Sequence, residues 1–384
     1  MDTPNRSRWF RFNLWLHRWA SLVATIPFLI LCLTGTVLIF HEEIDSALGV
    51  VPTATGLESQ PHRPLAESVD NMLAKFPKER IMSIGIDPEE HPGVLLLVTA
   101  PLQDRGFDRA NLRFTRLATA QPTAEGVEAS KTLTGFLLEL HSQWFLGPLG
   151  ELVGALIALL VLISLLSGLV VYAPYVKKIA FGVLRRGRSP RLLQLDLHNL
   201  IGAIVLGWAL AVSLTGFLLG FGTIATGIWQ ATELPQLRAR YAGATVDRRH
   251  PPADLDRVYA ASLAAAPKGW HIISVVFPDT DFSTDRHYTV LIGGQGLDEK
   301  LFRVALVDAT KGKVDTIVEL PWYLKAIVLS QPLHFGDYGG LALKLLWTLC
   351  TWLTLFITAN GAWLWWDRRR KRKAGGGDKT ETRA

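Results

Sequence analysis

The chain has 384 residues, of which 49% are hydrophobic and 19% charged, and its formal net charge at pH 7 is +6. Its two cysteines, Cys32 and Cys350, both lie within apolar segments, which excludes a disulfide framework. A C-x-x-C-H sequence for covalent haem attachment is also missing, so any haem would be held by side chains alone. The basic residues flank the apolar segments, which favours a role in membrane topology over nucleic-acid binding.

Four apolar segments are long enough to cross a bilayer, which takes about 20 residues of helix. In chain order they cover residues 20–40, 152–176, 200–228 and 345–366. The first exceeds the apolar core of a signal peptide, which has about 7–15 residues, and no small-residue cleavage site follows it. We therefore interpret it as a retained helix. The predicted fold class is a membrane α-helical protein with four transmembrane helices.

Basic clusters precede the first helix, connect the second and third, and follow the fourth. The positive-inside rule then predicts a multi-pass protein of the bacterial inner membrane, with both termini in the cytoplasm and two long loops in the periplasm. The predicted boundaries are 1–41 for the cytoplasmic N-terminus and first helix, 42–143 for the first outer module, 144–176 for the second helix, 177–197 for a basic cytoplasmic link, 198–229 for the third helix, 230–335 for the second outer module, 336–367 for the fourth helix, and 368–384 for a basic, disordered cytoplasmic tail.

The two halves of the sequence resemble each other. LHRWASLVATIPFLILCLTG at the first helix matches LHNLIGAIVLGWALAVSLTG at the third, which aligns His17 with His198. Before the second and fourth helices, LHSQWFLGPLG matches LHFGDYGGLAL, which aligns His141 with His334. The offset between matching residues increases steadily along the chain. This pattern indicates a parallel internal duplication, with its copies related by a pseudo-twofold axis along the membrane normal.

Each outer loop is typical of a small α+β module. Neither loop contains a phosphate-binding loop, a dinucleotide fingerprint or a nucleophile elbow. The cytoplasmic segments are too short to fold a flavin or nicotinamide domain. The expected elements are a helix at 65–76 and strands at 80–86 and 94–99 in the first module, and a helix at 253–266, strands at 271–277, 288–292 and 302–307, and a turn at 308–312 in the second.

Five histidines lie at the ends of the predicted membrane helices: His17, His41, His141, His198 and His334. A pseudo-twofold axis brings equivalent residues face to face, which is how a flat porphyrin receives two axial ligands. His17 with His198, and His141 with His334, therefore predict one bis-histidine haem b site near each membrane face. Two imidazole ligands leave no open coordination position on the iron, which favours electron transfer over oxygen binding.

His41 has no histidine equivalent, because the repeat places Gly222 at the matching position. Three roles stay open for it: an alternative outer ligand, a contact to a haem propionate, or an interfacial residue. Zinc is less well supported than haem, since no group of four closely spaced ligands is visible. A carboxylate-bridged metal site is disfavoured too, because the helices contain no Glu-x-x-His motif.

Several other residues near the helix ends have structural interpretations. Arg11, Arg18 and Arg191 could pair with haem propionates near the inner site, but the topology rule already explains them. The Gly-x-x-x-Gly sequences at 150–154 and 216–220 predict helix packing. Trp144, Trp322 and Tyr323 are candidates for lining an approach to the outer haem, and interfacial anchoring is the competing interpretation.

The LHRW and LTG sequences of the first helix, the LH before the second and the repeated outer module together resemble the PepSY-associated transmembrane-helix family over nearly all of residues 8–370. The resemblance implies outer PepSY modules, with haem b in the bundle held by His17, His198, His141 and His334. It also implies reduction of ferric siderophores in the periplasm to release ferrous iron. The implied partners are a ferric hydroxamate siderophore such as ferrioxamine, and an electron donor such as quinol or a cytoplasmic reductase.

Two other functions remain open for this sequence. The outer modules could bind a siderophore or a peptide as a transport accessory, with the histidines tuning protonation. Alternatively, PepSY modules also occur as inhibitors in peptidase propeptides, so the protein could regulate a protease without redox activity. Visible haem absorption distinguishes these alternatives from the preferred hypothesis, a transmembrane ferric-siderophore reductase.

Overall fold

The computed structural model describes residues 7–50, 60–85, 93–123, 131–177, 181–243, 245–294 and 301–374. Residues 375–384 of the predicted disordered tail and part of the basic link lie outside these residues, whereas residues 368–374 of that tail are helical, which corrects this part of the prediction. The chain divides into two compact units, which are described separately. The helical unit comprises Met1–Ile39, Leu140–Phe221 and Leu333–Ala384, and the sheet unit comprises Phe40–Glu139 and Gly222–Pro332.

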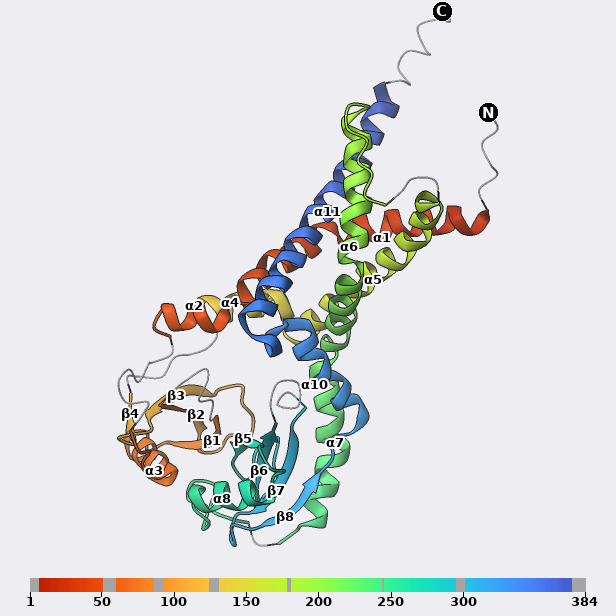
Figure 1. The fold of residues 1–384 in the computed structure, drawn as a ribbon. Helices are drawn as coiled ribbons and strands as arrows, with labels where there is room; N and C mark the ends of the chain where they lie inside the picture. The colour runs from red at the N-terminus through yellow and green to blue at the C-terminus, as the bar shows by residue number, and fades with distance from the viewer. Residues whose placement is uncertain are drawn as a thin grey trace, which may run out of the picture. The chain divides into compact units, whose positions relative to one another are not determined.

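Four long helices dominate the helical unit: α1 (Arg8–Leu38), α5 (Pro148–Val176), α6 (Pro190–Leu219) and α11 (Gly340–Ala374) (Figure 1). Each contains a segment long and apolar enough to cross a membrane, as predicted. A helix satisfies its own backbone hydrogen bonds, which is why an uncharged segment of this length becomes a helix in lipid. The short helices α4 (Leu133–Gln143) and α10 (Trp322–Phe335) precede α5 and α11, with the 3-10 turn η2 (Asp337–Gly339) after α10.

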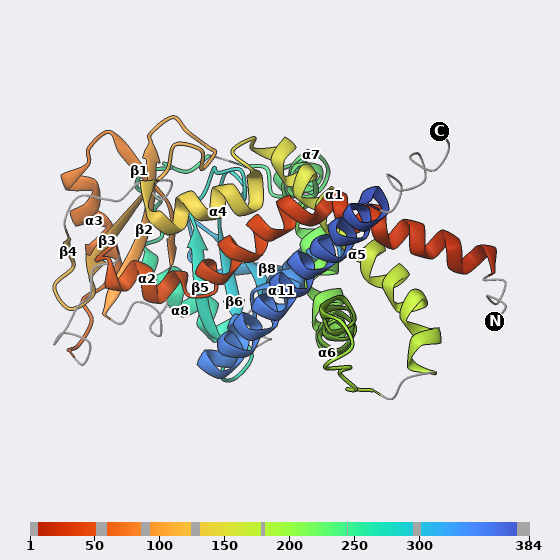
Figure 2. The same ribbon diagram turned by 90° about the horizontal axis from the view of Figure 1, so that it is seen from above.

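The long helices form a ring in which α1 and α6 lie on one diagonal. Helix α1 packs against α5 and α11, and α6 packs against the same two helices. Figure 2 shows α1, α6 and α11 from above. The close approach of α6 to α5 depends on Gly220, where a Cβ atom would lie 2.7 Å from the Glu151 carbonyl oxygen. Small residues at helix contacts are typical of membrane bundles.

The third predicted helix, 198–229, is two helices in the structure. Helix α6 ends at Leu219 with Gly220 as its C-cap, and α7 (Gly222–Arg240) begins after one further residue. The break occurs at the Gly-Phe-Gly sequence at 220–222, since glycine commonly ends helices. Hydropathy alone does not reveal it, because the apolar run continues across these residues. Helix α6 also begins earlier than predicted, at Pro190, where the Ser189 side chain caps it by accepting from the Leu192 N–H.

A buried carboxylate of α6, that of Asp196, binds the basic link between α5 and α6. Asp196 accepts hydrogen bonds from the backbone and guanidinium of Arg185, and from the Tyr175 hydroxyl at 2.5 Å. A buried charge is tolerated when it is paired and hydrogen-bonded in this way. Arg191 pairs with Asp367 at 3.0 Å and so ties the start of α6 to α11. Arg191 therefore has a structural partner within the helical unit.

The strands of the two predicted outer modules form a single antiparallel sheet, in the order β4-β3-β2-β1-β5-β6-β7-β8 (Figure 1). The two halves join where β1 pairs with β5, so the two predicted α+β modules share one sheet. The strands are β1 (Glu79–Gly85), β2 (Val94–Pro101), β3 (Asn111–Arg116), β4 (Gln121–Pro122), β5 (His271–Val276), β6 (His287–Gly293), β7 (Arg303–Asp308) and β8 (Val314–Val318).

Helices α3 (Leu65–Lys75) and α8 (Leu255–Ala265) pack against this sheet and against each other, close to the predicted ranges. One apolar core includes residues of both helices and of the central strands. Asp256 of α8 accepts from the backbone N–H groups of Leu65 and Ala66, at 2.8 and 3.0 Å. A carboxylate at a helix N-terminus satisfies free donors and complements the helix dipole. The two halves of the sheet unit are thus joined by polar contacts and by a common core.

Candidate functional site

The structure brings four of the predicted histidines together in two pairs. In the first pair, His17 of α1 faces His198 of α6 with ring centroids 6.3 Å apart and ring planes at 73°. In the second pair, His141 of α4 faces His334 of α10, also with centroids 6.3 Å apart and planes at 65°. Both pairs lie within the helical unit. The pairing is the one predicted from the repeat.

The separation within each pair suits a metal ion between the rings. An iron atom bound by imidazole nitrogens on opposite sides, each at about 2 Å, places the two ring centroids about 6 Å apart. Both observed separations are 6.3 Å. The residues present therefore fit a bis-imidazole site in both places.

Each of the four rings packs directly on a glycine of a neighbouring long helix. A Cβ atom on any of these glycines would lie 2.9–3.2 Å from a ring carbon, which is tighter than ordinary contact. Only glycine leaves room for an imidazole against the backbone. These ring glycines are Gly168 of α5 beside His17, Gly361 of α11 beside His198, Gly35 of α1 beside His141, and Gly216 of α6 beside His334.

Backbone carbonyls orient the rings of His17 and His334. Nδ1–H of His17 donates to the carbonyl of Ser164 at 2.8 Å, and Nδ1–H of His334 donates to that of Val212 at 3.0 Å. Each carbonyl lies one helical turn before the ring glycine. A proton held on Nδ1 leaves the lone pair on Nε2, the atom then free to bind a metal.

The other two rings interact with the backbone at the equivalent positions, Leu31 for His141 and Ile357 for His198, each one helical turn before the ring glycine. Nδ1 of His141 hydrogen-bonds the Thr34 hydroxyl at 2.8 Å, and that hydroxyl donates to the Ile30 carbonyl. Nδ1 of His198 interacts with the backbone of Ile357 but makes no hydrogen bond of standard geometry among the residues described. Burial lowers the pKa of His141 to about 3 and that of His334 to about 4. Both imidazoles are therefore neutral, the form that ligates metals.

The repeated L-T-G sequence has a role that the sequence alone did not reveal. In both copies the threonine hydroxyl lies beside Nδ1 of a histidine of the second pair, and the glycine accommodates its ring. Gly216 is therefore a ring glycine, which corrects the prediction that it serves helix packing. That interpretation is correct for Gly220. At Gly150 and Gly154, the nearest neighbours are residues 142–144.

His41 is the first residue of α2 (His41–Ala47) in the sheet unit. Its side chain is 46% exposed and its Nε2 lies 3.9 Å from a carboxylate oxygen of Glu42. Such exposure favours the interfacial role over coordination of iron. Its three proposed roles remain predictions.

The aromatic candidates differ in their surroundings. Trp322 is 80% exposed, and the Tyr323 hydroxyl donates to Glu233 at 2.9 Å. Trp144 follows α4 with a φ of 51°, and its buried Nε1 makes no hydrogen bond to the residues described. Exposure and a surface hydrogen bond favour anchoring for the first two residues.

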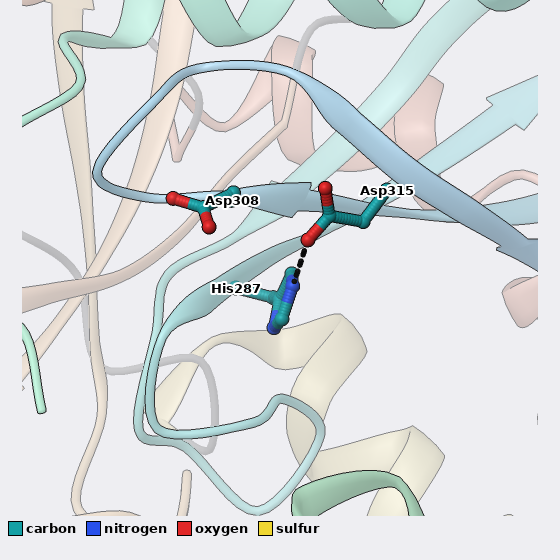
Figure 3. A group of neighbouring side chains, drawn as sticks. All are labelled: His287, Asp308 and Asp315. Carbon is teal, nitrogen blue, oxygen red and sulfur yellow. Dashed lines mark hydrogen bonds and ion pairs between the residues drawn. The ribbon is translucent and has the colours of Figure 1, made fainter. Parts of the chain in front are cut away.

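One further polar group in the sheet unit was not predicted (Figure 3). His287, Asp308 and Asp315 have ligand atoms within 4.8 Å of one another, the only such group among the residues described. His287 Nε2 lies 3.0 Å from Asp315, and Asp308 accepts from the backbone N–H groups of Thr310 and Lys311. Asp308 also pairs with Arg286. Its carboxylate thus holds the predicted turn at 308–312, and the group is an ion-pair cluster.

Comparison with known proteins supports the membrane assignment. An uncharacterized protein of Pseudomonas aeruginosa is 28% identical over 254 residues, which cover 61% of this chain and 63% of that relative. The match thus spans less than two thirds of the relative's length. The family model of the PepSY-associated TM region matches residues 14–368, which include all four histidines of the two pairs. The chain therefore belongs to the PepSY-associated TM family.

Proposed function

We propose that this protein is a b-type di-haem electron-transfer enzyme of the bacterial inner membrane, which reduces ferric siderophores in the periplasm and thereby releases ferrous iron. One observation carries the proposal: two separate histidine pairs have the same 6.3 Å ring separation. His17 and His198 would hold one haem, and His141 and His334 the other. When bound, haem supplies a one-electron ferric–ferrous couple.

The chain's own residues prepare these sites. The carbonyls of Ser164 and Val212 and the Thr34 hydroxyl hold the ring proton on Nδ1, which leaves Nε2 as the ligand atom. The ring glycines let each imidazole lie close to a helix, so its orientation is set by packing as well as by hydrogen bonds. Contacts of this kind around a metal ligand keep it in the productive rotamer and tune its basicity.

The spacing of the two pairs fits transport across a membrane. On α1, His17 and Gly35 are eighteen residues apart, which is about 27 Å of helix. The same count separates His198 from Gly216 on α6. Since a hydrocarbon core is about 30 Å thick, the two sites would lie near opposite faces. The duplication supports this arrangement, because each copy contributes one ligand to each site.

The direction of transfer follows from charge. By the positive-inside rule, the basic clusters support a cytoplasmic location of both termini and of the link between α5 and α6; the first pair would then lie on that side and the second on the periplasmic side. Electrons would enter from quinol or a cytoplasmic reductase. Within the family we place the chain nearest to the siderophore-iron reductase FoxB, with PepSY-like folds in the sheet unit. Its acceptor would be a ferric hydroxamate such as ferrioxamine, because ferrous iron binds these hard oxygen ligands more weakly.

The purified protein offers a direct test. We expect b-type absorption bands at about two haems per chain, and reoxidation of the anaerobically reduced protein when ferrioxamine is added. A ferrous-iron chelator in the same cuvette should report release of the metal. A folded but colourless protein would overturn the proposal, and reduced haem that ignores the ferric siderophore would overturn the assignment of substrate.

A further inference from the structure

An aromatic pair lies in the helical unit between the two histidine pairs. Trp208 of α6 and Trp347 of α11 have ring centroids 6.4 Å apart with planes at 86°. Tyr338 of η2 lies 6.5 Å from Trp347. The three rings form a continuous aromatic contact within the bundle.

Helical rise places these rings at successive depths. Trp208 lies ten residues after His198 and eight before Gly216, so about 15 Å of helix separates it from the first pair and about 12 Å from the second. Trp347 lies fourteen residues before Gly361, the ring glycine of His198, or about 21 Å along α11. Because α6 and α11 run in opposite directions, the Trp347 ring lies closer to the second pair than the Trp208 ring does.

Trp347 also packs directly against the chain segment that carries His334 of the second pair. A Cβ atom on Gly336 would lie 2.7 Å from the Trp347 indole, and Gly336 is two residues after His334. Gly336 has a φ of 71°, so its conformation as well as the space favours glycine. The indole of Trp347 therefore lies against the segment that carries one histidine of the second pair.

Membrane anchoring does not explain this pair. Anchoring tryptophans place the indole N–H at the headgroup level, where it finds a partner. The Nε1 atoms of Trp208 and Trp347 are buried and make no hydrogen bond to any residue that the structure describes. Trp352, on the same helix as Trp347, is 53% exposed and makes an instructive contrast. The buried indole nitrogens of Trp208 and Trp347 therefore call for another explanation.

We propose that Trp208 and Trp347 form the electron-tunnelling bridge between the two haem sites, an inference that rests on the proposed function. One electron leaves the first site and one arrives at the second, while the indoles are neither oxidised nor deprotonated and no bond forms or breaks. Tunnelling through packed aromatic rings decays less steeply than through lipid-filled or empty space. The positions that match Trp208 and Trp347 in the other half are Pro27 and Gly154, so the bridge runs along one side of the bundle.

Single-turnover kinetics test the bridge. The full-length protein is placed in phosphatidylcholine vesicles with the side of the second pair outward, reduced completely, and mixed with ferricyanide, an oxidant that does not cross the bilayer. The second site should oxidise first and the first site afterwards, at the rate of transfer between them. In Trp208→Leu and Trp347→Leu we expect the rate constant of the slower phase to decrease by about tenfold or more. A tenfold decrease is equivalent to about 1.4 kcal/mol of activation free energy.

Controls separate the possible outcomes. Trp352→Leu removes an indole of the same size from α11 and should leave both phases unchanged. Trp208→Phe and Trp347→Phe keep an aromatic ring and should restore most of the rate, with unaltered haem content and midpoint potentials. An unchanged slow phase in the Leu variants, with both haems present, would overturn the bridge alone. If a Leu variant loses haem, a slow phase in Trp352→Leu whose rate also decreases by about tenfold would overturn the bridge. Wild-type protein without haem bands would instead reject the proposed function.

Discussion

The two histidine pairs have the same ring separation but different supports. Both histidines of the first pair belong to the long helices α1 and α6. Those of the second pair belong to the short helices α4 and α10, just after the points where the chain passes from the sheet unit to the helical unit. The same ring separation can thus be built from histidines on long helices or from histidines on short helices.

The comparison also shows how the sites are coupled. Helix α1 supplies His17 to the first pair and Gly35 to the second, and α6 supplies His198 and Gly216 in the same way. Helices α5 and α11 contribute ring glycines to the first pair only. Two helices therefore serve both sites, which keeps the distance between the sites constant. The second pair additionally depends on the ends of α4 and α10 that belong to the helical unit.

The largest effect is expected from removing a ligand. His17→Ala or His198→Ala should abolish the first haem, and His141→Ala or His334→Ala the second, so each variant retains roughly half of the haem per protein. The pyridine haemochrome assay measures the content, and reduced-minus-oxidised spectra show which site remains. Retention of full haem by all four variants would contradict the pairing.

A smaller change tests the ring glycines. Gly216→Ala places a Cβ atom 2.9 Å from the His334 ring, so the imidazole must move and the second haem should be partly or wholly lost. Gly207→Ala on the same helix is the matched control, since nothing lies within 4 Å of a Cβ atom there. Haem content and the midpoint potential of the second site report the effect. Equal behaviour of the two variants would argue against packing of His334 on α6.

Hydrogen bonding should tune the second site more gently. Thr34→Val removes the hydroxyl that lies 2.8 Å from His141 Nδ1. The imidazole becomes less basic, so the midpoint potential of the second haem should rise, by no more than about 60 mV for this one-electron couple. Thr36→Val is the control, because the Thr36 hydroxyl donates to the Cys32 carbonyl of its own helix. A redox titration that gives identical potentials for both variants would contradict this role.

The smallest effect is expected at His41. His41→Ala should retain both haems and both midpoint potentials, because its side chain is 46% exposed. Haem stoichiometry and a redox titration measure this outcome. Loss of the second haem alone would make His41 a ligand and would replace the symmetric pairing of His141 with His334.

Much of the fold could be predicted because each membrane helix is specified by its own apolar segment. The strands were harder to predict. Strands β3, β4 and β8 are short or lie toward the sheet edges, where alternation is weak, and the pairing of β1 with β5 joins segments almost two hundred residues apart. Helix α7 was missed because an apolar run continues across the break after Leu219.

The sequence by itself determined the four membrane helices and the partners within each histidine pair. The helices follow from hydropathy and length, and the histidine partners follow from a repeat that alignment of the two halves reveals. Only the tertiary structure decided which glycine faces which ring and which carbonyl receives Nδ1–H, since His17 and Ser164 are 147 residues apart. Such contacts depend on helix rotation and depth, which packing sets and which no local pattern of residues encodes.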